Sequence, residues 1–146
     1  MKSKETLSQL KFMEASGQTT DKFNFEQFEL YLDLVEEEAL EMFNSYNDFV
    51  SDSPELIKNK CLEGIVDGLV DVVVTAKGAL LSLGVDVDSA MEEVWMSNLS
   101  KIQPDGTVIK RKDGKVMKPT TYIPPDFSKF VEGMDYTYTK SKYSVK

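Results

Sequence analysis

Two acidic segments carry the side chains whose types and spacing could do chemistry. The first holds Glu37, Glu38 and Glu41, and the second holds Asp67 and Asp71. Residues three or four apart share one face of an α-helix, so each segment would present its carboxylates together. Like charges at this spacing repel each other, and a bound cation would remove that penalty. Carboxylate oxygens suit hard divalent ions, so the two segments predict a site for Mg²⁺, Mn²⁺ or Ca²⁺.

The composition excludes several other kinds of site. The chain has no histidine and a single cysteine, Cys61, which rules out a triad with a histidine base and a histidine-ligated zinc site. Cys61 cannot form an internal disulfide, so we expect it to be buried in a cytoplasmic protein, in the host cytoplasm if the protein is viral. The net charge of −8 argues against nucleic acid as a partner.

No segment is expected to enter a membrane. The longest apolar stretch, residues 64–83, contains Asp67, Asp71 and Lys77 and is too polar to span a bilayer. The first five residues are followed by no apolar core, so no signal peptide is expected. The 146 residues are enough for one domain.

Four helices are predicted to position the acidic segments. Their apolar residues recur at intervals of three and four over residues 4–14, 24–48, 54–83 and 88–98. Ser53 is expected to cap the third helix, with Pro54 at its first position and Gly84 as its stop. Asp88 is expected to cap the fourth. The β-branched run over residues 70–75 would also fit a strand, but the length and the caps of the segment favour a helix.

A short loop near residues 51–53 would make the second and third helices antiparallel. With the loop centre as pivot, Glu41 falls opposite Glu63, and Glu37 and Glu38 fall level with Asp67. The two acidic patches would then face each other and could hold more than one Mg²⁺. The alternative is that such glutamate runs form solvated helix faces.

The chain changes character after residue 100. Residues 107–110 and 115–118 are predicted to be two short strands around an Asp-Gly turn, which is a strong hairpin signal. Residues 124–126 are expected to cap one more helical turn. We divide the chain into a single domain, residues 1–133, and a polar C-terminal tail, residues 134–146.

Four segments in this order resemble the MazG-like nucleotide pyrophosphohydrolases of the all-α NTP pyrophosphatase superfamily, in particular their phosphoribosyl-ATP pyrophosphohydrolase-like branch. Residues 37–41 read E-E-x-x-E, and residues 67–79 resemble the second acidic helix of the family. Residues 97–101 read S-N-x-S-K, and residues 122–126 read Y-x-P-P-D. The second family motif is commonly E-x-x-D, whereas Gly68 stands three residues before Asp71 here, and Asp67 takes the place of the glutamate.

The resemblance implies an all-α fold, an antiparallel helical bundle that is followed here by a short C-terminal β-hairpin. It implies an oligomer, a homodimer or a homotetramer built as a dimer of dimers. It also implies hydrolysis of an NTP or dNTP to the monophosphate and pyrophosphate with two or three Mg²⁺ ions per site, which Mn²⁺ can replace. The chain is similar to the phage MazZ-type enzymes, which act on dGTP, so dGTP or GTP is the expected substrate.

We assign roles to individual residues as hypotheses. The metal ligands would be Glu38, Glu41, Asp67 and Asp71, with Glu37 and Glu38 as the catalytic carboxylates, Glu37 as ligand or as the base that activates water. Asn98, Lys101, Lys77 and Tyr122 would contact the substrate. Two alternatives remain: phosphoribosyl-ATP as the substrate, or a non-catalytic acidic helical protein that recruits a basic partner.

Overall fold

The computed structural model describes residues 1–51, 54–136 and 141–144, and these residues form an all-α structure, as predicted. Its helices are α1 (Lys4–Ala15), α2 (Phe25–Val50), α3 (Glu55–Ser82), α4 (Val87–Leu99) and α5 (Ser128–Val131). Over the described part of the chain the only β contacts are two isolated bridges, between Phe23 and Leu83 and between Lys110 and Val116.

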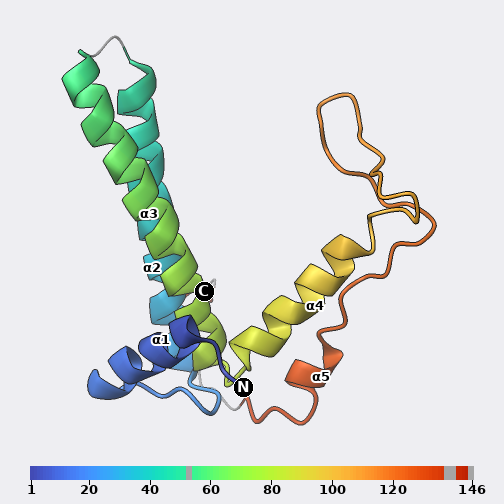
Figure 1. Ribbon diagram of the computed structural model, residues 1–146. Helices are drawn as coiled ribbons and strands as arrows, with labels where there is room; N and C mark the ends of the chain where they lie inside the picture. Colours follow the sequence, from blue (N-terminus) through green and yellow to red (C-terminus); the bar gives the residue numbers. More distant parts are fainter. Residues whose placement is uncertain (52–53, 137–140, 145–146) are drawn as a thin grey trace.

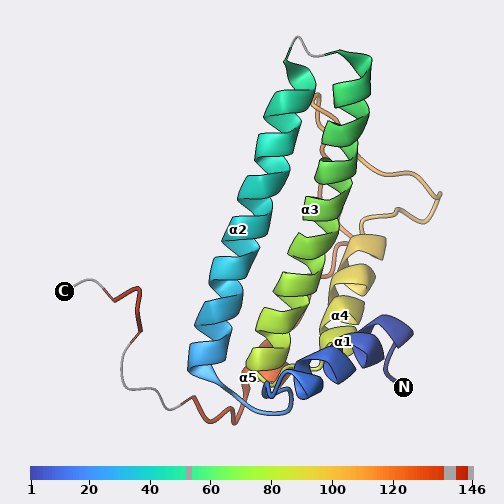
Figure 2. The ribbon, with the colours of Figure 1, turned by 90° about the vertical axis from the view of Figure 1, so that its left-hand side faces the viewer.

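Helices α2 and α3 form a long antiparallel hairpin (Figures 1 and 2). Helix α2 begins after Asn24, whose side-chain oxygen accepts a hydrogen bond from the Gln27 amide at 3.1 Å. The predicted cap Ser53 lies outside the described residues. Pro54 occupies the N-cap position of α3 and not its first helical position. The predicted loop position and the predicted antiparallel direction are both confirmed.

Helix α4 leaves the base of the hairpin at an angle, so that its far end lies well away from α3 (Figure 1). The turn between them uses Gly84 at φ +75°, a backbone conformation that favours glycine. The prediction that Asp88 caps α4 is wrong. The Asp86 side chain accepts from the Ser89 amide at 3.1 Å and is the cap, while Asp88 faces α1.

Helix α1 lies across the base of α3 (Figure 2) and is tied to α4 by Asp88. The two Asp88 oxygens accept hydrogen bonds from the Ser3 amide at 2.7 Å, from the Ser3 hydroxyl at 2.8 Å and from the Thr6 hydroxyl at 2.8 Å. Asp88 therefore completes the N-terminal cap of a helix that is more than eighty residues away in the sequence.

The hydrophobic core is small and lies where α1, α2, α3 and α4 meet. Its buried members come from all four helices: Met13, Tyr31, Ala79, Leu81 and Val87. Along the rest of the hairpin many apolar side chains are exposed, including Leu40, Phe43, Leu62, Val66, Leu69, Val70 and Val73. The fold therefore buries its apolar surface at one end and leaves a long apolar strip uncovered elsewhere.

An extended arm, residues 100–127, runs out from the end of α4 and returns along it (Figure 1). It makes the Lys110–Val116 bridge and the backbone bond from Arg111 N to Lys115 O at 2.7 Å. The structure therefore differs from the predicted pair of strands, since a two-stranded hairpin without a supporting layer is only marginally stable. The predicted turn after residues 124–126 is α5, where Asp126 accepts from the Ser128 amide at 2.9 Å.

The described end of the C-terminal tail lies against α2. Ser141 donates a hydrogen bond to Glu29, and Lys142 and Tyr143 both contact Asp33. Residues 137–140 and 145–146 of the predicted tail lie outside the described residues. None of the helices in the described ranges combines the length and the apolar character that a membrane span requires.

Candidate functional site

Three glycines of α3 set the register of the hairpin. A Cβ on Gly68 would lie 2.8 Å from the Met42 Cβ, and one on Gly64 would lie 2.5 Å from the Ser45 hydroxyl oxygen. A Cβ on Gly78 would overlap the Tyr31 ring at 2.1 Å. Such close approach brings the backbones of α2 and α3 together along a narrow seam.

Glu38 lies at the centre of the acidic cluster, which we define as Glu37, Glu38, Glu41, Asp67 and Asp71. Partial burial raises the pKa of the Glu38 carboxyl, and the negative charges of the other four raise it further, Asp71 most of all. Glu38 and Asp71 are half-buried and the others are exposed. The structure thus places the other four carboxylates within electrostatic reach of Glu38.

The register differs from the predicted one. Gly64 lies against Ser45, so its neighbour Glu63 lies roughly one and a half helical turns from the predicted position opposite Glu41. Glu63 instead pairs with Lys60 on its own helix, at 3.0 Å. The strongest partner of Glu38 across the seam is Asp71 and not Asp67. A pivot taken from the loop centre gave the wrong register because the close contacts at the glycines, and not the loop length, fix the alignment.

Close packing at Gly68 excludes a larger residue at this position. Gly68, which stands where E-x-x-D has its glutamate, is buried against the backbone of Met42, and a Cβ at this position would lie 3.1 Å from the Met42 nitrogen. A glutamate at this position has no room. Asp67 is exposed one residue earlier and lies within electrostatic reach of Glu38.

The donor chemistry of the acidic cluster fits a hard divalent cation. All five side chains supply oxygen, and their mutual repulsion is the kind that a cation relieves. In the described residues, however, no three acidic, histidine or cysteine side chains are close enough together to bind one ion. The carboxylates therefore do not form a ready-made ion site, and their side chains would have to rotate for any ion to be shared between the two helices.

A hollow lies beside the acidic cluster on the outer face of α3. It has a volume of about 670 Å³ and is lined by Asn59, Leu62, Glu63, Val66, Asp67 and Val70. Four of its six lining residues are apolar or carry no charge, and Asp67 lies at its border with the acidic cluster. This hollow offers space next to the carboxylates for a bound molecule.

Lys77 lies apart from the acidic cluster. Its ammonium nitrogen is 2.8 Å from Glu5 of α1, and its side chain is only 18% exposed. It borders an apolar groove of about 660 Å³ between α1 and α3, which also contains Phe12 and Val73. The structure therefore gives Lys77 a place in the contact between two helices.

The other three predicted substrate residues come together at the end of α4. The Lys101 ammonium donates to the Asn98 side-chain oxygen at 2.8 Å and lies 5.9 Å from the centre of the Tyr122 ring. Lys118 lies 4.8 Å from the same ring on the arm. Sequence analysis missed Lys118, because nothing in its neighbourhood predicted that the arm would fold back over α4.

The residues at the end of α4, Asn98, Lys101, Lys118 and Tyr122, form what we call the Tyr122 region. Within one chain this region is separate from the acidic cluster. The acidic cluster lies midway along the α2–α3 hairpin, whereas Tyr122 lies beside Ser97 and Lys101 at the end of α4, which diverges from the hairpin (Figure 1). Trp95 of α4 is 59% exposed. A single copy of the chain therefore does not place the predicted phosphate contacts beside the predicted metal ligands.

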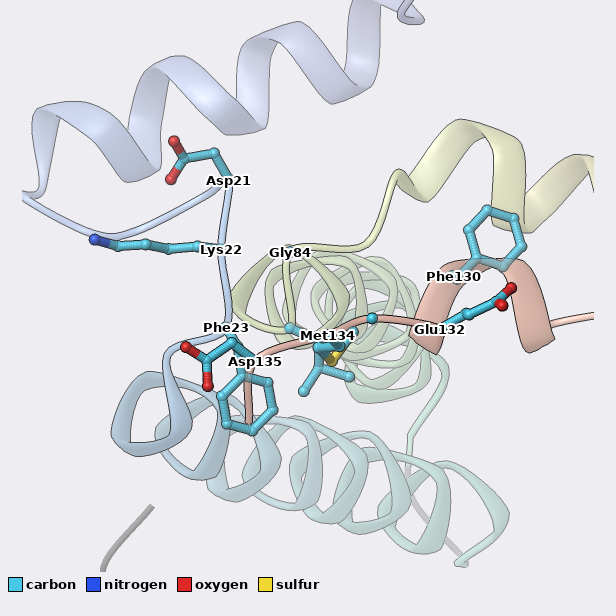
Figure 3. A pocket seen from close by; sticks show the side chains of 10 residues that line it. Asp21, Lys22, Phe23, Gly84, Phe130, Glu132, Met134 and Asp135 are labelled. Carbon is cyan, nitrogen blue, oxygen red and sulfur yellow. The ribbon is translucent and has the colours of Figure 1, made fainter. Parts of the chain in front are cut away.

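A further pocket of about 320 Å³ lies at the base of the molecule, between the segment before α2 and the segment after α5 (Figure 3). Phe23, Gly84, Phe130 and Met134 are among its lining residues. None of the predicted site residues lines it, so its position does not coincide with the acidic cluster or with the Tyr122 region.

Comparison with known proteins does not indicate a function for this chain. No family model matches the chain, and no curated protein matches it.

Proposed function

We propose that the chain is a Mg²⁺-dependent nucleotide pyrophosphohydrolase that cleaves an NTP or dNTP to the monophosphate and pyrophosphate. The observation that carries this proposal is that two α2 carboxylates, Glu37 and Glu41, and two α3 carboxylates, Asp67 and Asp71, lie close enough for their charges to act on Glu38. A hydrolase that acts on a triphosphate needs several divalent ions, because the phosphate chain carries up to four negative charges.

The roles of the residues follow from their positions. Glu38, Glu41, Asp67 and Asp71 would hold two or three Mg²⁺ ions, which neutralise the phosphate oxygens and acidify water when bound. Mn²⁺ can serve as a substitute. Glu37 is exposed next to this set and would accept the proton of the attacking water. The water oxygen bonds to the α-phosphorus, the bond from that phosphorus to the α–β bridging oxygen breaks, and pyrophosphate leaves.

We propose that the working form is a homodimer or a homotetramer. Many large apolar side chains are exposed along α2 and α3. Single exposed apolar residues are ordinary on a protein surface, whereas a strip of them indicates an interaction surface. A second copy would cover this strip and could bring its own Asn98, Lys101 and Tyr122 to the acidic cluster of the first. Light scattering during size-exclusion chromatography tests the assembly, and a monodisperse monomer at micromolar concentration would refute it.

The resemblance to MazZ-type enzymes makes dGTP and GTP the first substrates to test. We expect activity in a panel of eight NTPs and dNTPs with Mg²⁺ or Mn²⁺, with products resolved by ion-exchange chromatography. Monophosphate and pyrophosphate should appear together, without a diphosphate intermediate. Inclusion of phosphoribosyl-ATP in the panel distinguishes the alternative substrate.

Variants connect the activity to the acidic cluster. Replacement of Glu41 with Gln should reduce turnover by about a hundredfold or more, as expected for loss of a metal ligand. The matched control is Glu36→Gln, which removes the same charge one residue before the acidic cluster from an exposed position on α2. Equal loss in both variants, or no hydrolysis of any nucleotide by the parent protein, would favour the non-catalytic acidic protein instead.

A further inference from the structure

Two lysines converge on one aromatic ring at the end of α4. The Lys118 ammonium lies 4.8 Å from the centre of the Tyr122 ring, and the Lys101 ammonium lies 5.9 Å from it. Lys101 belongs to the turn that follows α4, while Lys118 comes from the returning part of the arm. Two like charges are therefore brought to one place by two separate segments of the chain.

The ring on which they converge is held firmly. The Ser97 side chain, which is buried, hydrogen-bonds to Tyr122. Next to it, the Ser100 hydroxyl accepts from the Ile123 amide at 2.8 Å, and the Thr121 hydroxyl donates to the Ser100 carbonyl at 3.2 Å. The return of the arm along α4 is thus fixed on both sides of Tyr122, so the two lysines share a preformed position.

The positive charges of these two lysines are not neutralised by a carboxylate of the described residues. Within residues 1–51, 54–136 and 141–144, neither Lys101 nor Lys118 forms a salt bridge, although six other basic residues do. Lys101 donates to the neutral side chain of Asn98. Residues 101–122 contain six basic and two acidic residues in a chain whose net charge is −8. The arm is therefore a local region of positive potential in an acidic protein.

We propose that Lys118 and Lys101, together with Tyr122, form a binding site for a polyphosphate anion. Ammonium groups bind phosphate as compact point charges, and an anion with several charged oxygens can contact both lysines at once. The Tyr122 hydroxyl can donate a further hydrogen bond. The identification of this anion with the phosphate chain of a nucleotide rests on the proposed function, whereas anion binding itself requires no metal ion.

Inorganic pyrophosphate is the probe, and titration calorimetry in the presence of EDTA is the measurement. The parent protein should bind it, and Lys118→Gln should weaken the binding by about tenfold, as expected for loss of a charge-assisted contact. The matched control is Lys112→Gln, which removes an equal charge from an exposed position in the turn of the arm. It should change the affinity by less than about twofold.

A second readout reports on the geometry. The Ser97 hydrogen bond lowers the pKa of the Tyr122 phenol, and the charges of Lys118 and Lys101 lower it further against partial burial. Ultraviolet titration, with Tyr122→Phe used to assign the transition, should show that this pKa rises in Lys118→Gln and rises in the parent protein when pyrophosphate is added. Circular dichroism checks that each variant is folded.

The outcomes separate this site from the proposed enzyme. Pyrophosphate binding that is unchanged in Glu41→Gln but weakened in Lys118→Gln supports the site, and it does so even if no nucleotide is hydrolysed. No binding by the parent protein, or equal weakening by Lys112→Gln and Lys118→Gln, would overturn it, because the attraction would then be absent or would belong to the arm as a whole.

Discussion

Gly68 of α3 lies against Met42 of α2 so closely that a Cβ on the glycine would be 2.8 Å from the Met42 Cβ and 3.1 Å from its Cα. This contact keeps the two backbones close and brings Glu38 to Asp71 across the seam. The acidic cluster thus depends on a residue that has no side chain of its own.

Replacement of Gly68 with Ala should destabilise the protein by about 1–3 kcal/mol, because the added methyl group meets the backbone of Met42, which cannot move aside. The matched control is Gly64→Ala. Its added methyl group meets mainly the end of the Ser45 side chain, and the gain of about 1 kcal/mol in helix propensity offsets that contact. Chemical denaturation measures both. A Gly68→Ala variant as stable as Gly64→Ala would refute the close packing.

Replacement of Glu38 with Gln should stabilise the protein at neutral pH in the absence of divalent ions. Partial burial and the neighbouring carboxylates raise the pKa of Glu38 in the folded protein. Glu38 therefore contributes to the free energy of unfolding below its ordinary pKa of 4.5, and this contribution is lost as the pH rises through the raised pKa. Thermal melting at pH 4 and pH 7 measures the effect. The stability difference between parent and variant should grow as the pH increases.

The same pair of proteins tests the cation. Mg²⁺ should raise the melting temperature of the parent protein, because an ion that binds only the folded state stabilises it. It should raise that of Glu38→Gln much less. Glu36→Gln serves as the control for charge, since Glu36 is not among the residues that shift the pKa of Glu38. An equal response in all three proteins would mean that the ion binds elsewhere.

Asp88 should make the docking of α1 sensitive to acid. The hydrogen bond from the Ser3 amide, with those from the Thr6 and Ser3 hydroxyls, lowers the pKa of Asp88 from 3.8. Its contribution to stability is therefore present above this value and is lost as the pH falls through the lowered pKa. Asp88→Asn should melt at a lower temperature than the parent at pH 7, and the difference should shrink below about pH 4. Glu92→Gln, an exposed change on the same helix, should show no such trend.

Lys77 is expected to act on stability and not on substrate binding. Its ion pair with Glu5, at 2.8 Å, joins α1 to α3. The Glu5 side chain is exposed, and solvent weakens the attraction between the two charges. Lys77→Gln and Glu5→Gln should lower the melting temperature by similar small amounts and should not add in the double variant. A raised Michaelis constant in Lys77→Gln, with an unchanged melting temperature, would restore its predicted role as a phosphate contact.

Much of the helical framework could be predicted from the sequence, because apolar spacing and capping residues act locally. The long hairpin, its turn and the burial of Cys61 follow from such signals. The sequence alone does not identify the N-cap of α4, because Asp86 and Asp88 are both suitable capping residues. In the structure Asp88 binds Ser3, and Asp86 caps the helix. The position of Ser3 depends on how α1 packs against α4, which no local pattern encodes.

The register of the hairpin could have been improved from the sequence alone. Gly64 and Gly68 are four residues apart, so they share a face of α3 and indicate where a neighbouring helix can approach closely. The direction of α4 could not have been predicted in the same way, since it follows from the Gly84 turn and from the contacts of Asp88. The position of Lys118 on Tyr122 depends in turn on that direction.

The one-sided core has a consequence for how the molecule comes apart. Its buried residues, such as Met13, Leu81 and Val87, gather where four helices meet, while the distal half of the hairpin has only its two helices to hold it. Within the hairpin, deuterium uptake in a dilute solution should accordingly be faster near residues 45–50 and 55–60 than around residues 75–82. The distal ends of the two helices should therefore unfold before the base does, and a protease should cut the hairpin at those ends before it cuts near the base.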